Sequence, residues 1–375
     1  MGGSGWKIGR VAGIDLAIHP SWLVIAFLLT FSLADAFFPR VIPGWSAGQY
    51  WLLGAGTAVL FFGSVLAHEF SHALVARRLG LKVGGITLFI FGGATTIETE
   101  SASPRDEALI ALAGPVSSLA LGAVLLAIGA LVQQAEVQAL VGWLGVINVA
   151  LGAFNLVPGY PMDGGRVLRA ILWRIGGDPL TATRRAAMVG RVIGYLMVAG
   201  GIYWALRTQD IGSGLWLALV GWFLATAAEA TLQQAGVEKS LSGVRVRDAM
   251  DLSPAAVSPN ESVADLVSEH MLRGDDRSFL VRHEDGGLAG VVTLGDVRRL
   301  PRESWADRRV TDIMTRYGDL ATIGPDAPLA DALRLIQERE VGQLPVIGEE
   351  ARQPLGLVTR RGILRLIEAR MKLGL

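Results

Sequence analysis

Residues 65–74 read Val-Leu-Ala-His-Glu-Phe-Ser-His-Ala-Leu, which places His68, Glu69 and His72 inside an apolar run. On a helix, positions four residues apart share a face, so both imidazoles can bind one metal ion, and Glu69 beside them can act on a water molecule. The stretch from Trp51 to Ala67 carries no charge, so we expect this helix to lie in an apolar environment. Because polar side chains are costly to bury there, we predict a metal site rather than two ordinary core histidines.

The composition indicates a membrane protein. Of the 375 residues, 51% are hydrophobic and only 18% are charged. The formal net charge is zero, so we expect no nucleic-acid partner. The chain has no cysteine, which leaves histidine, carboxylate and water as ligands for any metal.

The apolar runs predict a polytopic α-helical domain over residues 1–235, embedded in the lipid bilayer. Each of about six runs approaches the 20 or so residues that a spanning helix needs. The predicted spans are 21–38, 51–79, 107–132, 140–157, 187–206 and 214–232. Between the second and third, residues 84–98 are rich in β-branched and aromatic residues around Gly92-Gly93, which predicts a small β-hairpin insert. That hairpin is either an interfacial loop or an edge strand to which an extended substrate adds.

The distribution of Lys and Arg predicts the orientation in the cell membrane. Basic residues precede the first span and follow the second and fourth spans, whereas the segment between the third and fourth spans has none. By the positive-inside rule, the N-terminus should be cytoplasmic. An even number of spans then places the C-terminal half in the cytoplasm as well.

A zinc site needs a third protein ligand besides the two histidines. Asp163 is the strongest candidate, because it follows the fourth span in a segment, residues 155–165, that prolines and glycines break. Irregular backbone at membrane depth is tolerated only against protein or a wet cavity, so an Asp there should be functional or paired. An Asp that merely caps the next turn is the simpler interpretation. His19, Glu98 and Asp106 are the other candidates for the third ligand.

Together these motifs resemble the site-2 protease family, zinc metalloproteases that cleave transmembrane segments within the bilayer. The resemblance rests on His-Glu-x-x-His at 68–72, Asn-x-x-Pro at 155–158 and Asp-Gly at 163–164. It implies one Zn²⁺ per chain, held by His68, His72 and Asp163, with Glu69 as general base. It also implies that Asn155 contacts the substrate or stabilises the oxyanion. The implied partner is a single-span or already cleaved membrane protein.

From about residue 244 the chain becomes charged and turn-rich, and it contains a repeat. Asp-Ala-Met at 248–250 recurs as Asp-Ile-Met at 312–314, and Gly-Val-Val-Thr at 290–293 recurs as Gly-Leu-Val-Thr at 356–359. Each copy reads strand, helix, strand, strand, helix. We expect a linker over 236–243 and two soluble α/β copies over 244–304 and 305–375.

The repeat resembles a tandem pair of CBS domains, which commonly bind adenine nucleotides between the copies. The family's signature, Ser or Thr followed three residues later by Asp, is present in the first copy as Thr293 and Asp296. The second copy has Thr359 but Gly362 in place of the Asp, which puts its nucleotide site in doubt. Homodimerisation through the CBS pair is a further expectation.

We therefore predict an intramembrane zinc endopeptidase whose activity an adenine nucleotide modulates. An ion transporter or channel with a cytoplasmic CBS sensor is an alternative from another class, and a proteolytically inactive scaffold is a third. Glu69 discriminates between them, because a transporter has no need of a general base beside the first histidine.

Overall fold

The computed structural model describes residues 5–90, 92–97, 101, 103–274, 276–348 and 353–373. The chain divides into two compact units, Met1–Ala235 and Gly236–Leu375. The chain becomes charged and turn-rich shortly after this boundary.

The N-terminal unit is built on helices long and apolar enough to cross a membrane, and the described part of the chain has six of them, as predicted. They are α1 (Ser21–Ser32) with its continuations η1 (Leu33–Phe37) and α2 (Phe38–Val41), α3 (Ala47–Arg78), α4 (Pro104–Leu131), α5 (Ala135–Asn155), α7 (Pro179–Thr208) and α8 (Ile211–Leu241). Five of them begin earlier than the apolar runs predicted for them. Helix α7 begins at Pro179, where the Asp178 carboxylate accepts hydrogen bonds from the first free backbone N–H groups.

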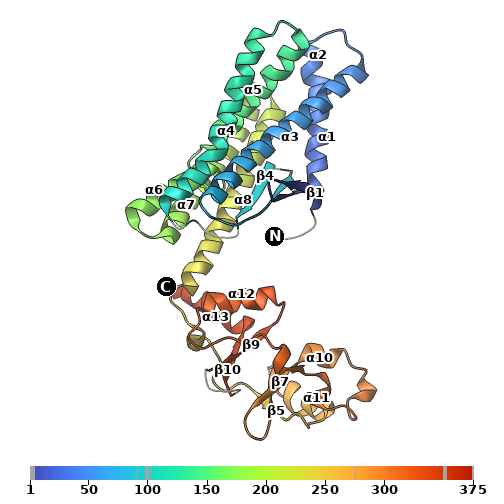
Figure 1. Cartoon of the computed structure of the whole chain (residues 1–375), viewed down its shortest axis with the longest axis vertical. Coiled ribbons are helices and arrows are strands. Elements are labelled where there is room, and N and C mark those ends of the chain that lie inside the picture. The colour runs from blue at the N-terminus through green and yellow to red at the C-terminus, as the bar shows by residue number, and fades with distance from the viewer. Residues whose placement is uncertain are drawn as a thin grey trace. The chain divides into compact units, whose positions relative to one another are not determined.

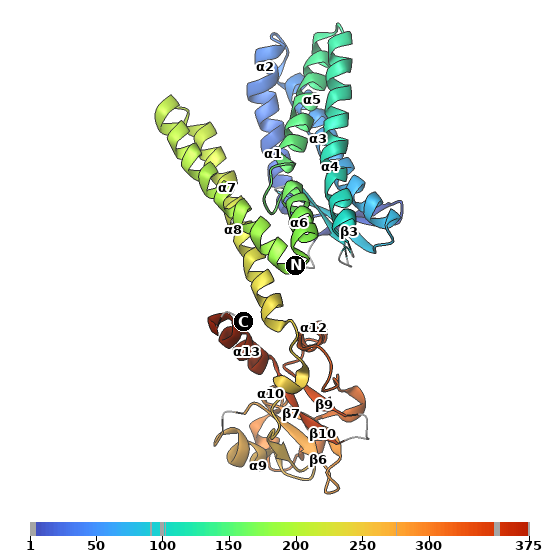
Figure 2. The ribbon, with the colours of Figure 1, turned by 90° about the vertical axis from the view of Figure 1, so that its left-hand side faces the viewer.

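Small residues let α4 and α5 approach closely, and Figures 1 and 2 show these helices side by side with α3. A Cβ added at Gly122 of α4 would lie 2.9 Å from the carbonyl oxygen of Gly145 on α5. A Cβ added at Gly152 of α5 would lie 2.9 Å from the carbonyl oxygen of Pro115 on α4. Such small-residue contacts replace the hydrophobic effect, which lipid does not supply between helices.

Helix α6 (Asp163–Gly176) is short and is not one of the six candidate spans. It ends at Gly177, which adopts a left-handed conformation with φ of 72°. This helix was not predicted, and its first turn carries Asp163.

A four-stranded sheet lies at one end of the helices (Figure 1), in the order β1 (Trp6–Val11), β2 (Ile14–Ile18), β3 (Val83–Phe89), β4 (Gly92–Ile97). The predicted hairpin is the antiparallel pair β3–β4, and β2 pairs with β3 in parallel. The two N-terminal strands were not predicted. The sequence feature that indicated these strands was the alternation of the apolar residues Ile14 and Leu16. Both are buried against Ile86 of β3 and Ala73 of α3.

The C-terminal unit contains two copies of one α/β motif, as predicted. The first copy comprises β5 (Ala256–Val257), α9 (Val263–Asp265) with η3 (Leu266–Met271), β6 (Ser278–Arg282), β7 (Leu288–Thr293) and α10 (Leu294–Arg298). The second comprises α12 (Leu329–Glu338), β9 (Gln343–Ile347), β10 (Pro354–Thr359) and α13 (Arg360–Leu373), with a single parallel bridge from Ile323 to Val346 in place of the first strand. The short helix η2 (Val246–Asp248) precedes the first copy. Between α10 and α12 lie the short helices η4 (Arg302–Ser304), α11 (Val310–Ile313) and η5 (Tyr317–Asp319) and strand β8 (Thr315–Arg316).

Each copy has its own apolar core, and a third cluster joins the two. That cluster contains Leu280 and Val291 from the first copy and Leu357 from the second. Residues 236–241, which we expected to belong to a linker, continue helix α8, and Leu241 is buried in the core of the second copy.

Candidate metal centre

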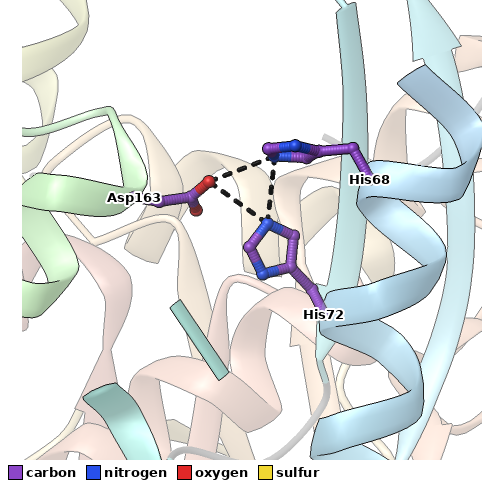
Figure 3. A group of neighbouring side chains, drawn as sticks. All are labelled: His68, His72 and Asp163. Atoms are coloured by element: carbon purple, nitrogen blue, oxygen red, sulfur yellow. Dashed lines mark hydrogen bonds and ion pairs between the residues drawn. The ribbon is translucent and has the colours of Figure 1, made fainter. Parts of the chain in front are cut away.

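Helix α3 presents His68 and His72 on one face. They are one helical turn apart, and each is only 4% exposed. Their Nε2 atoms lie 3.2 Å from each other. Figure 3 shows both rings turned toward the same point in space.

Asp163, the first residue of α6, completes this group from the opposite side (Figure 3). Its Oδ2 lies 3.2 Å from Nε2 of His68 and 3.2 Å from Nε2 of His72. Burial alone would raise the pKa of Asp163, but the hydrogen bonds of His68 and His72 outweigh it and lower that pKa to about 2. The side chain is therefore an anion at neutral pH.

The three ligand atoms form an almost equilateral triangle, which fits a zinc ion. For bonds of about 2.0–2.1 Å, tetrahedral coordination places ligand atoms about 3.3 Å apart. The donor set of two imidazoles and one carboxylate is also one that zinc uses in catalytic sites, with a fourth position left open. Among the described residues, this is the only group of three or more His and acidic residues with converging ligand atoms.

Helix α4 orients both histidine rings through their other nitrogens. Nδ1 of His72 donates to the carbonyl oxygen of Ile110 at 2.7 Å, which leaves Nε2 as the ring nitrogen that can bind a metal once it has lost its proton. Nδ1 of His68 lies 2.9 Å from the hydroxyl of Ser118. Such outer partners hold the tautomer and the orientation of metal-binding histidines.

Gly114 of α4 leaves room for the two rings and for an ion between them. A Cβ at this position would lie 2.2 Å from Nε2 of His72 and 2.6 Å from Nε2 of His68. Any side chain would therefore displace the rings.

Glu69 is half-buried beside the triad and is held by strand β4. The Thr95 hydroxyl donates to Oε2 of Glu69 at 2.7 Å. A Cβ at Gly93 would lie 2.4 Å from Cγ of Glu69, so the glycine allows β4 to pass close to this side chain. The strand thus confines the carboxylate next to the metal ligands.

Two glycines allow the tight turn that places Asp163. A Cβ at Gly164 would lie 2.3 Å from the carbonyl oxygen of Leu156, and one at Gly165 would lie 2.3 Å from the backbone nitrogen of Tyr160. Asn155, expected at the substrate, ends α5, and its amide donates to the carbonyl oxygen of Leu151 at 3.0 Å. Its role at the substrate stays a prediction.

Of the other candidates for the third ligand, His19 and Asp106 are not part of the triad. Nδ1 of His19 lies 2.7 Å from the hydroxyl of Ser21 in its own turn. Asp106 lies in the first turn of α4, where its backbone N–H donates to the Ser103 hydroxyl. Glu98 lies outside the described residues.

In the C-terminal unit, Thr293 and Asp296 bond to each other at the start of α10. The Thr293 hydroxyl and backbone N–H donate to Oδ2 of Asp296 at 2.7 and 2.9 Å. In the second copy, the hydroxyl of Thr359 accepts from the backbone N–H of Gly362.

A cavity of about 780 Å³ adjoins α10 and is rich in arginine. Its wall includes the basic residues Arg277, Arg298, Arg302 and Arg361, the acidic Asp276, and apolar residues such as Met271 and Trp305. Arg361 comes from the second copy, so both copies contribute to the cavity.

Known proteins resemble the chain along nearly its whole length. The model of peptidase family M50 matches residues 56–135 and 129–199, and that of the CBS domain matches 246–303 and 310–369. The Mycobacterium tuberculosis protein Rip3 is 36% identical over 365 residues, 96% of this chain and 92% of Rip3. This chain belongs to peptidase family M50, the site-2 proteases.

The zinc metalloprotease MJ0392 of Methanocaldococcus jannaschii is 30% identical over 295 residues, 78% of this chain and 79% of the relative. The solved site-2 protease of Methanocaldococcus jannaschii is 28% identical and covers 61% of this chain and 95% of that chain, with a TM-score of 0.44.

The M50 protein is therefore a zinc metalloendopeptidase with a pair of CBS domains, and the six apolar helices among its described residues make it a multi-pass membrane protein.

Sequence reasoning missed several residues of its metal centre. Ser118 and Thr95 are ordinary polar residues in an apolar helix and a strand, and neither lies near the metal ligands in the sequence. No local pattern could have assigned them, because only the packing of α4 and β4 on α3 brings them to the centre.

Proposed function

We propose that this enzyme hydrolyses a peptide bond within or near a transmembrane segment of a single-span or previously cleaved membrane protein. The observation that carries the proposal is a complete ligand triad, two members of which lie with the Glu69 carboxylate on a helix apolar enough to span a bilayer. From His68 to Arg77, near the end of α3, the helix rises by about 13 Å. If Arg77 and Arg78 mark the membrane interface, the centre lies within the hydrocarbon layer.

His68, His72 and Asp163 would hold the zinc ion. When bound, the ion lowers the pKa of water and polarises the scissile carbonyl. Glu69 accepts a proton from the attacking water and returns it to the leaving amine. The Thr95 hydroxyl holds the Glu69 carboxylate in place for both transfers. Asn155 is the residue we assign to substrate binding or to the oxyanion.

Strand β4 would receive the substrate as an added strand. It is an edge strand in the sheet order and also contacts Glu69 through Thr95. A helical substrate must unwind before its carbonyls are accessible, and main-chain bonds to an edge strand offset the helical bonds that it loses.

The decisive experiment measures cleavage of a model single-span substrate by the purified protein in detergent, for wild type and Glu69→Gln, with zinc content determined for both. We expect about one zinc ion in each and cleavage by wild type alone. Cleavage by Glu69→Gln at the wild-type rate would refute the role of this residue as the base. Absence of zinc from wild type, under conditions that preserve metal, would refute the metal centre itself.

We also propose that an adenine nucleotide binds the CBS pair and modulates proteolysis. The arginine-lined cavity beside α10 supports this, because guanidinium groups pair with phosphate oxygens. Asp296 and Thr293 would contact the ribose, and Thr359 marks the weaker second site. A homodimer formed through the CBS pair would be the assembly that the nucleotide affects.

Equilibrium binding of AMP and ATP to the full chain tests this second proposal. Asp296→Asn should weaken binding by about tenfold, as expected for the loss of one charged hydrogen bond. Asp285→Asn, at an exposed loop position of the same copy, should leave binding unchanged. If saturating nucleotide alters neither the cleavage rate nor the oligomeric state, the regulatory role is refuted.

We infer a cytoplasmic location for the N-terminus and the CBS pair. The arginines at the end of α3 and along α6 support this orientation, because positive charge favours the cytoplasmic side.

A further inference from the structure

A buried ion cluster next to the metal centre has no part in the chemistry described above. Glu107, in the first turn of α4, is only 2% exposed. Its Oε1 lies 3.0 Å from Nε of Arg166 and 3.3 Å from Nη1 of Arg169, both on α6. The hydroxyl of Ser101 donates to Oε2 of Glu107 at 2.9 Å. The carboxylate is thus surrounded by donors and joins α4 to α6.

This cluster is one helical turn from Asp163 on α6 and one helical turn from the residue of α4 that holds His72. On α6, Arg166 follows Asp163 by three residues, a spacing at which side chains on a helix can touch. On α4, Glu107 precedes Ile110, whose carbonyl oxygen holds His72, by three residues. Glu107, Ile110, Gly114 and Ser118 therefore lie on one face of α4, and each contacts either a ligand or the helix that carries one.

Arg166 is the residue that could compete with zinc for the Asp163 carboxylate. A guanidinium forms short, paired hydrogen bonds with a carboxylate, and an Asp and an Arg three residues apart on a helix attract each other. If Arg166 bonded to Asp163, the carboxylate would be occupied by a cation other than zinc. In the structure Arg166 is bonded to Glu107 instead.

We propose that Glu107 is a positioning residue that holds Arg166 away from Asp163 and so keeps the third ligand free for zinc. The inference rests on the zinc endopeptidase function proposed above. It differs from a purely structural role, in which Glu107 only anchors α6 to α4. The two roles make different predictions when the competing guanidinium is also removed.

The test measures the zinc affinity of the full-length protein in detergent by competition with a chelator. Glu107→Gln should weaken zinc binding by about 10–100-fold, the usual effect of losing an outer-shell partner. The double variant Glu107→Gln with Arg166→Gln should recover most of that loss, because no guanidinium then competes for Asp163. Arg166→Gln alone should bind zinc nearly as wild type does, because Arg169 still pairs with Glu107.

The matched control is Glu229→Gln, which removes the partner of Arg191 in the ion pair between α7 and α8. This variant should retain wild-type zinc affinity. The absorption spectrum of the Co²⁺-substituted protein gives a second readout. Glu107→Gln should change the coordination bands, and the double variant should restore them.

Wild-type affinity in Glu107→Gln, or no recovery in the double variant, would overturn the proposal. If Glu107→Gln does not fold, Glu107→Asp replaces it, because the shorter carboxylate should loosen Arg166 and the loss should again be reversed by Arg166→Gln. Failure of wild type to bind zinc would instead refute the metal centre. Wild type that binds zinc but does not cleave would refute only the proposed protease activity.

Discussion

At the scale of single residues, the metal centre depends on side chains that themselves bind neither metal nor substrate. Thr95 is the clearest case, because its hydroxyl lies 2.7 Å from one carboxylate oxygen of Glu69 and 3.2 Å from the backbone oxygen of the same residue. A general base contributes only when its carboxylate faces the reacting water. Thr95 therefore restricts the rotamers of Glu69 without touching the ligands.

Replacing Thr95 by valine keeps the shape of the side chain and removes the hydrogen bond. We expect kcat to fall by about tenfold, the effect of losing one hydrogen bond to a charged group. Zinc content and KM should remain those of wild type, because Thr95 contacts no ligand. Thr96→Val is the matched control, since Thr96 is exposed on the same strand. Equal rates for the two variants would contradict the role of Thr95.

At the scale of elements, glycines decide how closely the membrane helices approach. On α7, a Cβ at Gly201 would lie 2.5 Å from the carbonyl oxygen of Gly214 on α8, whereas a Cβ at the neighbouring Gly200 would meet no atom within 4 Å. Gly194 of α7 is in equally close contact with α8, since its Cβ would lie 2.6 Å from the backbone nitrogen of Ala225. The pairing of α7 with α8 thus rests on backbone contact at a few positions.

Gly201→Ala should destabilise this helix pair, and Gly200→Ala should not. Overpacking by one methyl group in a close contact costs about 1–3 kcal/mol. An alanine at the open position is neutral or slightly stabilising, because alanine favours the helix over glycine. Thermal unfolding in detergent micelles measures the difference. A lower midpoint for Gly200→Ala than for Gly201→Ala would show that the close contact does not stabilise the pair.

At the scale of the whole molecule, the inferred orientation in the membrane decides on which side the N-terminus and the CBS pair lie. With the N-terminus and the CBS pair in the cytoplasm, the pair would share a compartment with the nucleotide that we propose it binds. The segment between α4 and α5 must then lie on the opposite side of the membrane, because the spans of α1, α3 and α4 separate it from the cytoplasmic N-terminus.

Labelling of introduced cysteines tests this orientation directly, because the native chain has none. We expect Glu284→Cys, in an exposed loop of the CBS pair, to react with a membrane-impermeant maleimide only after the cells are permeabilised. Gln134→Cys, exposed between α4 and α5, should react in intact cells. The unmodified protein is the background control. The reverse pattern would invert the topology.

The local parts of this protein follow from its sequence. The spacing of His68 and His72 belongs to one helix, each apolar run belongs to one span, and Gly-x-Val-Thr occurs once in each domain. These patterns can therefore be recognised without knowing which segments pack against them. Helix α6, the N-terminal strands and the choice of Asp163 among several candidates were decided by tertiary structure. Their positions depend on the packing of distant segments: α4 orients both histidines, Glu107 binds α6, and β4 confines Glu69. The physical reason is that a metal centre is a geometry of side chains from several elements, whereas a sequence pattern reports the periodicity of one element at a time.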